Sequence, residues 1–474
     1  VSHRGRVEGR ERRKPAAMGG SHTWLAVLAA ALVLAAAVPV PGPLPDLNRM
    51  PLFNPSRSTT MDLDQGHPIM VHYADADTQL SGYTCKDKIS LGGFSADVKF
   101  ACFTDAPEQA MQFWSQMGNG ILGLGPAAQK KHDNAGHLMP PPVVNQMAGV
   151  LDAQKDVLTK KFAFMSRRNA AELQMGGYVP GSIQGQMRTT KSLTPKGYTV
   201  GIKSMRIGKT FDDAQELLVF GPNSPQHHVP AILDTGSPCI MLPENDESKN
   251  LQFSPYEQYQ DRMQPWTKMF ITVEGLDQGL EIAYEDLLVE HHTFLDAAWG
   301  TSIRPCVMPV DWSVAAPHWT PIVLGAVFFR SFNVLFDNAR ASDTVPPTVG
   351  FAKQNRGYDP IGIKENQVAG RGGDGDAVHR VYVQHDPIKV VHGVTKVGVS
   401  NPNGHQFFTQ LSVGTPPQRL KVVVDTGSPL FGLFVNPKSL SDFEKGVSNV
   451  PHRRPAPLAH TTGAAQAGAG RPAG

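Results

Sequence analysis

Two aspartates of this chain stand in the same five-residue string. Asp-Thr-Gly-Ser-Pro begins at Asp234 and again at Asp425, behind the apolar runs "PAIL" and "KVVV". The glycine in each string allows a close backbone approach, and the Thr and Ser hydroxyls can hold the carboxylate oxygens. The pattern predicts two carboxylates, each presented at the end of a buried strand by a tight turn.

The chemistry of such residues depends on whether the two carboxylates meet. Two adjacent carboxylates cannot both ionise easily, so they share a proton and titrate as a pair. The ionised partner can take a proton from a water molecule that attacks a carbonyl carbon, while the protonated partner donates to the carbonyl oxygen. The pair therefore predicts peptide hydrolysis at acid pH, without metal or cofactor. Either string alone is equally well explained as a hairpin turn.

The elements that must position these residues are predicted to be mostly β-strands. A chain of 474 residues is long for one hydrophobic core, which favours two lobes. It holds 46 Gly and 39 Pro, and its apolar runs are short and separated by turn residues. The net charge of +2 is spread along the sequence, which argues against a nucleic-acid partner or a polybasic membrane surface.

An apolar stretch near the start, "WLAVLAAALVLAAAV" over 24–38, predicts a route through the secretory pathway. Ala35 and Ala37 have the spacing of a signal-peptide cleavage site. The stretch is short for a bilayer span and has no charged flank after it. We interpret it as a cleaved signal peptide; the alternative is an uncleaved anchor, the one case in which membrane contact is expected.

The four cysteines are disulfide candidates because the secretory route is oxidising. Cys85 and Cys102 flank a hairpin pattern, and a turn centred just after Gly93 would place them opposite each other. Cys239 and Cys306 would then form the second pair. Buried free thiols are the alternative.

Several longer strings resemble the pepsin-type aspartic endopeptidases. "FFTQLSVGTPPQRLKVVVDTGS" over 407–428 is similar to the family's opening strands and first active-site turn, and "PAILDTGS" to its second. "VHYADADTQLSGYTCKDKISLGG" over 71–93 resembles the flap hairpin. "GILGLGP" over 120–126 and "IVLGAVFFRSFNVLFD" over 322–337 resemble the strands behind the aspartates. The resemblance implies an all-β, bilobal fold with an active-site cleft between the lobes and an extended peptide or protein as substrate.

The resemblance also implies roles for individual residues. Asp425 and Asp234 become the catalytic carboxylates of the first and second lobe. The supporting residues of the two turns are Thr235, Gly236, Ser237, Thr426, Gly427 and Ser428. The threonines would lock the turns together, and the serines would hydrogen-bond the outer carboxylate oxygens. Tyr73 would close over the substrate as the flap tyrosine; its alternative is a half-buried strand residue.

This chain departs from the family most clearly in the order of its pieces, since the opening segment comes last. The predicted divisions are a leader and signal peptide over 1–47, the rest of the N-lobe with the flap over 48–190, the C-lobe over 191–356, a flexible linker over 357–378, the displaced opening segment over 379–440, and a disordered tail over 441–474. A circular permutation and a misassembled tandem gene both explain this order. We expect a monomer; the alternative is a dimer that exchanges the displaced segment.

Two further alternatives concern function. Pro238 and Pro429 stand where the family usually has Ser or Thr, and the flap string lacks a nearby glycine. These departures leave open a catalytically inactive, peptide-binding protein. The histidine pairs at 227–228 and 291–292 are interpreted as solvated loop residues, because no third ligand has a recognisable spacing, so no metal site is predicted. The family and the secretory route together imply a secreted protein or one of an acidic vacuolar or lysosomal compartment.

Overall fold

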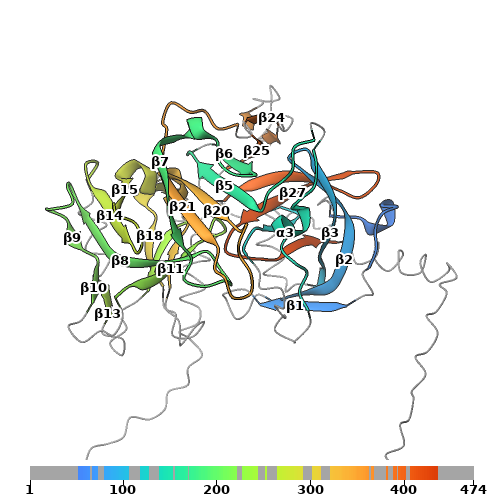
Figure 1. Ribbon diagram of the computed structural model, residues 1–474, viewed down its shortest axis with the longest axis horizontal. Coiled ribbons are helices and arrows are strands. Elements are labelled where there is room, and N and C mark those ends of the chain that lie inside the picture. The colour runs from blue at the N-terminus through green and yellow to red at the C-terminus, as the bar shows by residue number, and fades with distance from the viewer. Residues whose placement is uncertain are drawn as a thin grey trace, which may run out of the picture.

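A computed structural model gives the fold of the chain, which is nearly all β (Figure 1). The residues that it describes are 52–63, 67–72, 79–105, 118–126, 138–152, 155–168, 170–220, 227–243, 251–253, 264–291, 302–310, 321–361, 365–367, 380–382, 388–391, 393–401 and 406–435. The predicted leader, the tail over 441–474 and most of the linker over 357–378 lie outside these ranges. No helix within them has both the length and the apolar character of a membrane span.

The N-lobe is built on a seven-stranded sheet that draws on both ends of the chain. Across the sheet the strands are β1 (Pro68–His72), β2 (Gln79–Leu91), β26 (Phe408–Val413), β27 (Gln418–Asp425), β4 (Gly120–Gly123), β28 (Phe431–Phe434) and β3 (Phe94–Asp105). β2 also pairs with β3, so the sheet closes on itself between these two strands and β1 extends it at the outer side of β2. In Figure 1 the red strands of the late chain lie among the blue strands of the early chain.

The C-terminal segment, as we call residues 393–435, is thus an integral part of the N-lobe. Its β27 lies between β26 and β4, and its β28 lies between β4 and β3. Its end lies beside the first described residues, because Phe53 N–H donates to the Phe434 carbonyl at 3.1 Å. Asn54 and Gln418 exchange two hydrogen bonds of 3.0 and 2.9 Å. The piece that comes last in the sequence therefore occupies the interior of the sheet.

The C-lobe has its own sheet of eight strands. In order they are β15 (Leu280–Ala283), β14 (Lys268–Val273), β8 (Thr199–Gly208), β11 (Val229–Leu233), β19 (Ile322–Leu324), β12 (Ile240–Pro243) and β18 (Val307–Val310), with β9 (Gln215–Glu216) paired to β8. β11 lies antiparallel to β8 and parallel to β19. This placement repeats that of β27, which lies antiparallel to β26 and parallel to β4.

A third sheet joins the two lobes. Its strands are β24 (Ile388–Val391), β25 (Val394–Val399), β6 (Ala171–Met175), β5 (Lys161–Ser166), β20 (Phe332–Asp337), β21 (Thr348–Gln354) and β7 (Ile183–Lys191). Its apolar residues pack against both lobes: the ring of Phe164 lies 4.7 Å from that of Phe407 in the C-terminal segment and 5.5 Å from that of Phe329. Buried aromatic pairs of this kind hold the lobes in one continuous core.

The remaining elements are short. The two-stranded pairs are β10 (Leu218–Phe220) with β13 (Leu251–Phe253), β16 (Leu288–His291) with β17 (Ser302–Pro305), and β22 (Glu365–Gln367) with β23 (Arg380–Tyr382). The helical turns are η2 (Pro55–Arg57), α3 (Val143–Met147), η4 (Pro180–Ser182), α5 (Tyr284–Leu287) and η6 (Phe328–Arg330).

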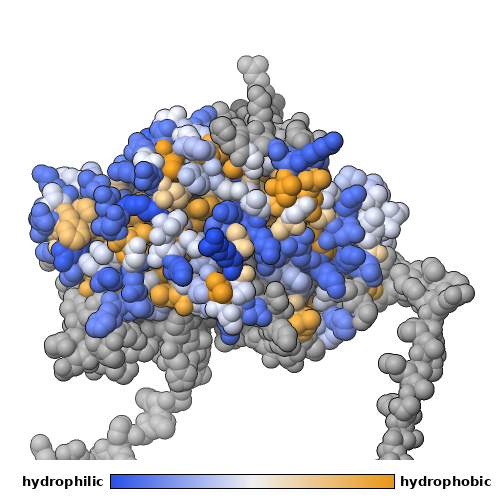
Figure 2. Space-filling model, viewed as in Figure 1, coloured by the Kyte–Doolittle hydropathy of each residue, from blue (hydrophilic) through white to orange (hydrophobic). Residues whose placement is uncertain are grey.

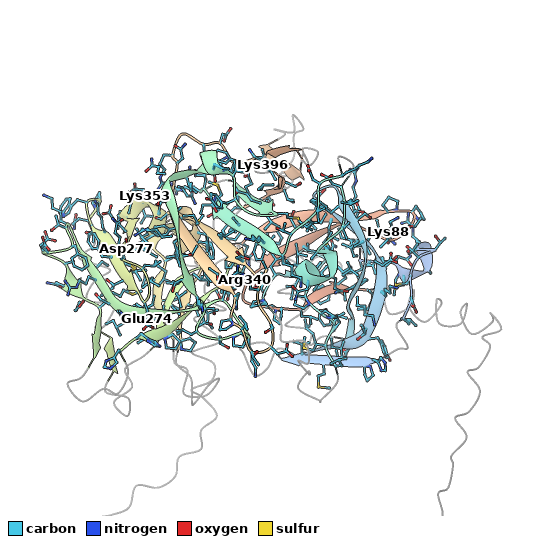
Figure 3. All side chains as sticks on the ribbon, in the orientation of Figure 1. Lys88, Glu274, Asp277, Arg340, Lys353 and Lys396 are labelled. Carbon is cyan, nitrogen blue, oxygen red and sulfur yellow. A yellow bond between two sulfur atoms is a disulfide. The ribbon has the colours of Figure 1, made fainter. Side chains whose placement is uncertain are left out.

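The surface carries charges of both signs on both lobes. The face in Figure 2 is largely hydrophilic, with small hydrophobic groups scattered over it. Figure 3 labels charged side chains on the outside of the molecule, with Lys88 on the N-lobe, Glu274 and Asp277 on the C-lobe and Lys396 on the interlobe sheet.

Both disulfides are formed, although the register of the first differs from the expected one. Cys85 is joined to Cys102, and Cys239 to Cys306. The β2–β3 turn is centred between Gly92 and Gly93, one residue earlier than expected, so Cys85 pairs with Phe100 and not with Cys102. The two cysteines lie diagonally, and their Cα atoms are still only 5.9 Å apart. Both glycines of the turn have positive φ, which glycine adopts without a steric penalty.

Candidate active site

The two predicted aspartates lie at equivalent places in the two lobes. Asp425 is the last residue of β27, and Asp234 directly follows β11. Each of these strands runs parallel to a neighbour, β4 in the N-lobe and β19 in the C-lobe. Parallel neighbours present their carboxyl ends at the same edge of a sheet, where chemistry is commonly placed in open sheets. Both side chains are half-buried at that edge.

Two threonines join the turns across the lobes. The Thr235 hydroxyl donates to the Val424 carbonyl at 2.7 Å, and the Thr426 hydroxyl donates to the Leu233 carbonyl at 2.8 Å. Each hydroxyl also accepts the other threonine's backbone N–H at 3.0 Å. Both side chains are fully buried. Four hydrogen bonds made by these buried hydroxyls fix the positions of the two turns relative to each other.

The carboxylates are held by donors of their own turns. Asp234 accepts the Gly236 N–H at 2.8 Å and the Ser237 hydroxyl at 2.6 Å. Asp425 accepts the Gly427 N–H at 2.8 Å and the Ser428 N–H at 3.1 Å. The expected serine contact is therefore present in the second lobe only.

Ser428 differs from Ser237 in the use of its hydroxyl. The Ser428 Oγ accepts the N–H of Leu430 at 3.2 Å, and the residue reaches Asp425 through its backbone N–H. A serine hydroxyl can cap the following backbone instead of a nearby carboxylate, and sequence does not distinguish these options.

The glycines of the two turns allow the aspartates to meet. A methyl group at Gly427 would lie 2.5 Å from Oδ1 of Asp234, and one at Gly236 would lie 2.8 Å from Oδ1 of Asp425. Any side chain at either position would collide with the carboxylate of the other lobe. Each carboxylate thus lies against the turn of the other lobe, close enough for the two carboxyls to interact.

The pKa of Asp425 is affected by burial and by the neighbouring carboxyl. Burial raises the pKa of Asp425 well above its ordinary value, and the negative charge of Asp234 and the hydrogen bond between the two carboxyls raise it further. The N–H groups of Gly427 and Ser428 oppose this rise in pKa, because they favour the ionised form. The proton that the pair shares is therefore held to a higher pH than the proton of an isolated aspartate.

Backbone N–H groups behind the aspartates also hold the two turns, and they could not be identified from the sequence. The Leu124 N–H donates to the Asp425 carbonyl at 2.7 Å, and the Gly125 N–H donates to the Ser428 carbonyl at 2.8 Å. In the other lobe the Ala326 N–H donates to the Ser237 carbonyl at 2.7 Å. The apolar-apolar-Gly strings signalled these strands, but only the fold shows which amide meets which turn.

The other predicted residues fall in three places. Tyr73 lies outside the described residues, in the stretch that follows β1, and its flap role stays a prediction. Cys239 and Cys306 join the end of the Asp234 turn to the start of β18, with Cα atoms 4.8 Å apart. The Nδ1 of His228 lies 2.8 Å from a carboxylate oxygen of Glu274. Within the described ranges no three His, Cys, Asp or Glu side chains gather as metal ligands would.

Comparison with known families gives this geometry its context. A model of the eukaryotic aspartyl protease family matches residues 19–354 and 406–443. The first part contains Asp234 and the second contains Asp425, and together they cover well over half of the chain. This chain belongs to the eukaryotic aspartyl protease family. A search of curated proteins found no match.

The split in the match follows the order of the pieces. In this aspartyl protease the second matched part, 406–443, carries β26, β27 and β28, and these strands complete the N-lobe sheet of the first part. The family assignment and the all-β bilobal fold were both predicted from the sequence, and both are confirmed.

Proposed function

We propose that this aspartyl protease is an endopeptidase that hydrolyses peptide bonds at acid pH with Asp234 and Asp425 as a catalytic pair. The observation that carries the proposal is the close approach of the two carboxyls, each of which lies against the turn glycine of the other lobe, with the turns tied by the buried threonines. Such a tie pre-organises the pair before substrate arrives, which is the main source of rate in this class of site.

We place the shared proton on Asp425, whose pKa is raised. We assign the activation of water to Asp234, which is held by the Ser237 hydroxyl and the Gly236 N–H. Asp234 takes a proton from a water molecule while the oxygen of that water bonds to the carbonyl carbon of the peptide. Asp425 gives its proton to the carbonyl oxygen, and a neutral gem-diol forms.

Collapse of this intermediate completes the cycle. The proton on Asp234 passes to the peptide nitrogen, the C–N bond breaks, and a diol proton returns to Asp425 as the carboxylic acid product forms. The amine and the acid leave, and the pair again holds one proton. No covalent bond to the enzyme is formed in this sequence.

The substrate proposed for the cleft is an extended peptide with large apolar residues on both sides of the cleaved bond, with Tyr73 closing over it. Two disulfides favour an oxidising, secretory location, and a pair that needs one proton favours an acidic compartment within or beyond that route.

The proposal is tested with a peptide that carries two adjacent large apolar residues, at pH near 4. We expect cleavage by the wild type, inhibition by a peptide mimic with a hydroxyl at the cleavage position, and loss of cleavage in Asp234→Asn. Cleavage that survives this substitution would contradict the paired mechanism. A wild type that binds the mimic without cutting the peptide would be the inactive, peptide-binding alternative.

A further inference from the structure

Tyr198 lies where the two lobes meet and contacts the support of both aspartate turns. It directly precedes β8 and is fully buried. Its ring lies 4.4 Å from that of Phe336 and 6.0 Å from that of Phe162, both on the interlobe sheet. A tyrosine buried this completely must satisfy its hydroxyl within the protein.

The hydroxyl reaches the N-lobe turn. It donates to the Leu124 carbonyl at 3.0 Å. That carbonyl belongs to the same peptide group as the Gly125 N–H, which donates to the Ser428 carbonyl at 2.8 Å. The Leu124 N–H in turn donates to the carbonyl of Asp425 at 2.7 Å. Tyr198 therefore holds the Leu124–Gly125 peptide group, which in turn holds the Asp425 turn at Ser428.

The backbone of the same residue reaches the C-lobe turn. The Tyr198 carbonyl accepts the N–H of Leu233, the residue before Asp234, at 2.9 Å. One residue thus contacts the support of Asp425 with its side chain and the support of Asp234 with its main chain. This path between the turns is separate from the threonine hydrogen bonds.

The direction of the hydrogen bonds is fixed. A carbonyl can only accept, so the phenol proton points to Leu124, and the Tyr198 oxygen accepts from the Asn338 Nδ2 at 2.7 Å. Burial raises the pKa of the Tyr198 phenol, with a smaller opposing effect from Asn338, so the donor remains protonated over the whole acid and neutral range.

We propose that Tyr198 is a positioning residue that sets the placement of Asp425 relative to Asp234. It touches neither carboxyl, so it acts through Leu124 and Leu233. The change expected in kcat rests on the proposed function, whereas the change expected in the structure around Leu124 does not.

The test compares Tyr198→Phe with a matched control, Tyr358→Phe. Both substitutions keep the ring and remove one hydroxyl that donates to a buried acceptor; the Tyr358 hydroxyl donates to Glu172 at 2.7 Å. Glu172 lies on β6, and none of the contacts described for Tyr358 reaches an aspartate turn. Tyr198→Phe loses two hydrogen bonds, one to Leu124 and one from Asn338, and Tyr358→Phe loses one to a carboxylate, so both variants should lose thermal stability.

Two measurements distinguish a positioning role of Tyr198 from a contribution to stability alone. We expect kcat to fall about tenfold in Tyr198→Phe with KM changed less than about twofold, because misplacement of a catalytic group affects the transition state more than substrate binding. In Tyr358→Phe both parameters should stay within about twofold of wild type. Hydrogen exchange at the Leu124 and Gly125 amides should accelerate in Tyr198→Phe alone.

The results that decide the role of Tyr198 differ from those that decide the endopeptidase proposal. A wild type without peptide cleavage would overturn the endopeptidase proposal, and amide exchange would still decide the role of Tyr198. Unchanged exchange at Leu124 and Gly125, or an equal fall of kcat in both variants, would overturn the positioning role.

Discussion

At the scale of single residues, the site depends on the unequal surroundings of two chemically identical side chains. Asp234 has a serine hydroxyl and one N–H, whereas Asp425 has two N–H groups and a raised pKa. The sequence shows the same letters, Asp-Thr-Gly-Ser-Pro, in both turns. It could predict the pair, but it could not predict the unequal hydrogen bonds of the two carboxylates, because these depend on how Ser428 directs its hydroxyl.

The raised pKa of Asp425 predicts a pH-dependent cost in stability. The folded state binds this proton more tightly than the unfolded state, so the contribution to stability is full below the ordinary value of 3.8 and is lost as pH rises through the raised value. Asp425→Asn cannot ionise and escapes this loss. We expect the melting temperature of the variant, relative to that of the wild type, to rise as the pH increases from 4. A difference in melting temperature that does not depend on pH would contradict the raised pKa of Asp425.

The buried threonines give a second prediction at this scale. Thr426→Val keeps the shape of the side chain but leaves the Leu233 carbonyl and the Thr235 N–H without partners. We expect a loss of about 2–4 kcal/mol in unfolding free energy by denaturant titration. Thr426→Ser keeps the hydroxyl, and its loss should stay near 1 kcal/mol or below. Equal losses in the two variants would show that the methyl group, and not the hydroxyl, matters.

At the scale of elements, the sequence predicted the hairpin of β2 and β3 but misplaced its turn. The Gly-Gly pair is a clear turn signal, yet a shift of one residue in its centre moves the cysteines from opposite to diagonal positions. Register is set by the packing of alternate side chains over the whole strand, including Phe100 and Ile89 in the core, and two turn residues do not determine it.

The disulfides provide a prediction for these elements. The Cys239–Cys306 bond spans 67 residues, whereas the Cys85–Cys102 bond spans 17. In the chain-entropy account, the longer loop restricts the unfolded chain more, by about 1 kcal/mol. Denaturant midpoints of the two double Cys→Ala variants should differ in that direction. A larger loss from the shorter bond would show that packing in the β2–β3 hairpin dominates.

At the scale of the whole molecule, the N-lobe is complete only when the C-terminal segment is inserted. The described residues before 362 and after 393 both lie beside β6, because the Ile361 N–H donates to Glu172 of β6 at 3.0 Å and β25 pairs with β6. Lys396 of β25 also lies 4.7 Å over the ring of Tyr358. Closing a long loop costs little more than closing a short one. We therefore propose that each chain completes its own N-lobe. The sequence could predict that the pieces fit one another, because the strings complement each other, but not that they join within one chain.

Mixing two inactive variants tests this proposal. Asp234→Asn and Asp425→Asn are refolded together in equal amounts and assayed for peptide cleavage. If each chain inserts its own segment, every site carries one Asn and the mixture is as inactive as either variant. If segments are exchanged between two copies, about a quarter of the sites regain both aspartates. The mass of the refolded protein by light scattering provides the control.

The most direct test of the central claim is the pH dependence of kcat for peptide cleavage by the wild type and by Asp425→Asn. The account predicts a bell-shaped profile for the wild type, because catalysis requires Asp234 ionised and Asp425 protonated. The fall at higher pH reports the loss of the proton that the pair shares, at a pH above the ordinary range of an aspartate. Asp425→Asn should show no cleavage at any pH. A variant that cleaves the peptide at a rate near that of the wild type would contradict the account.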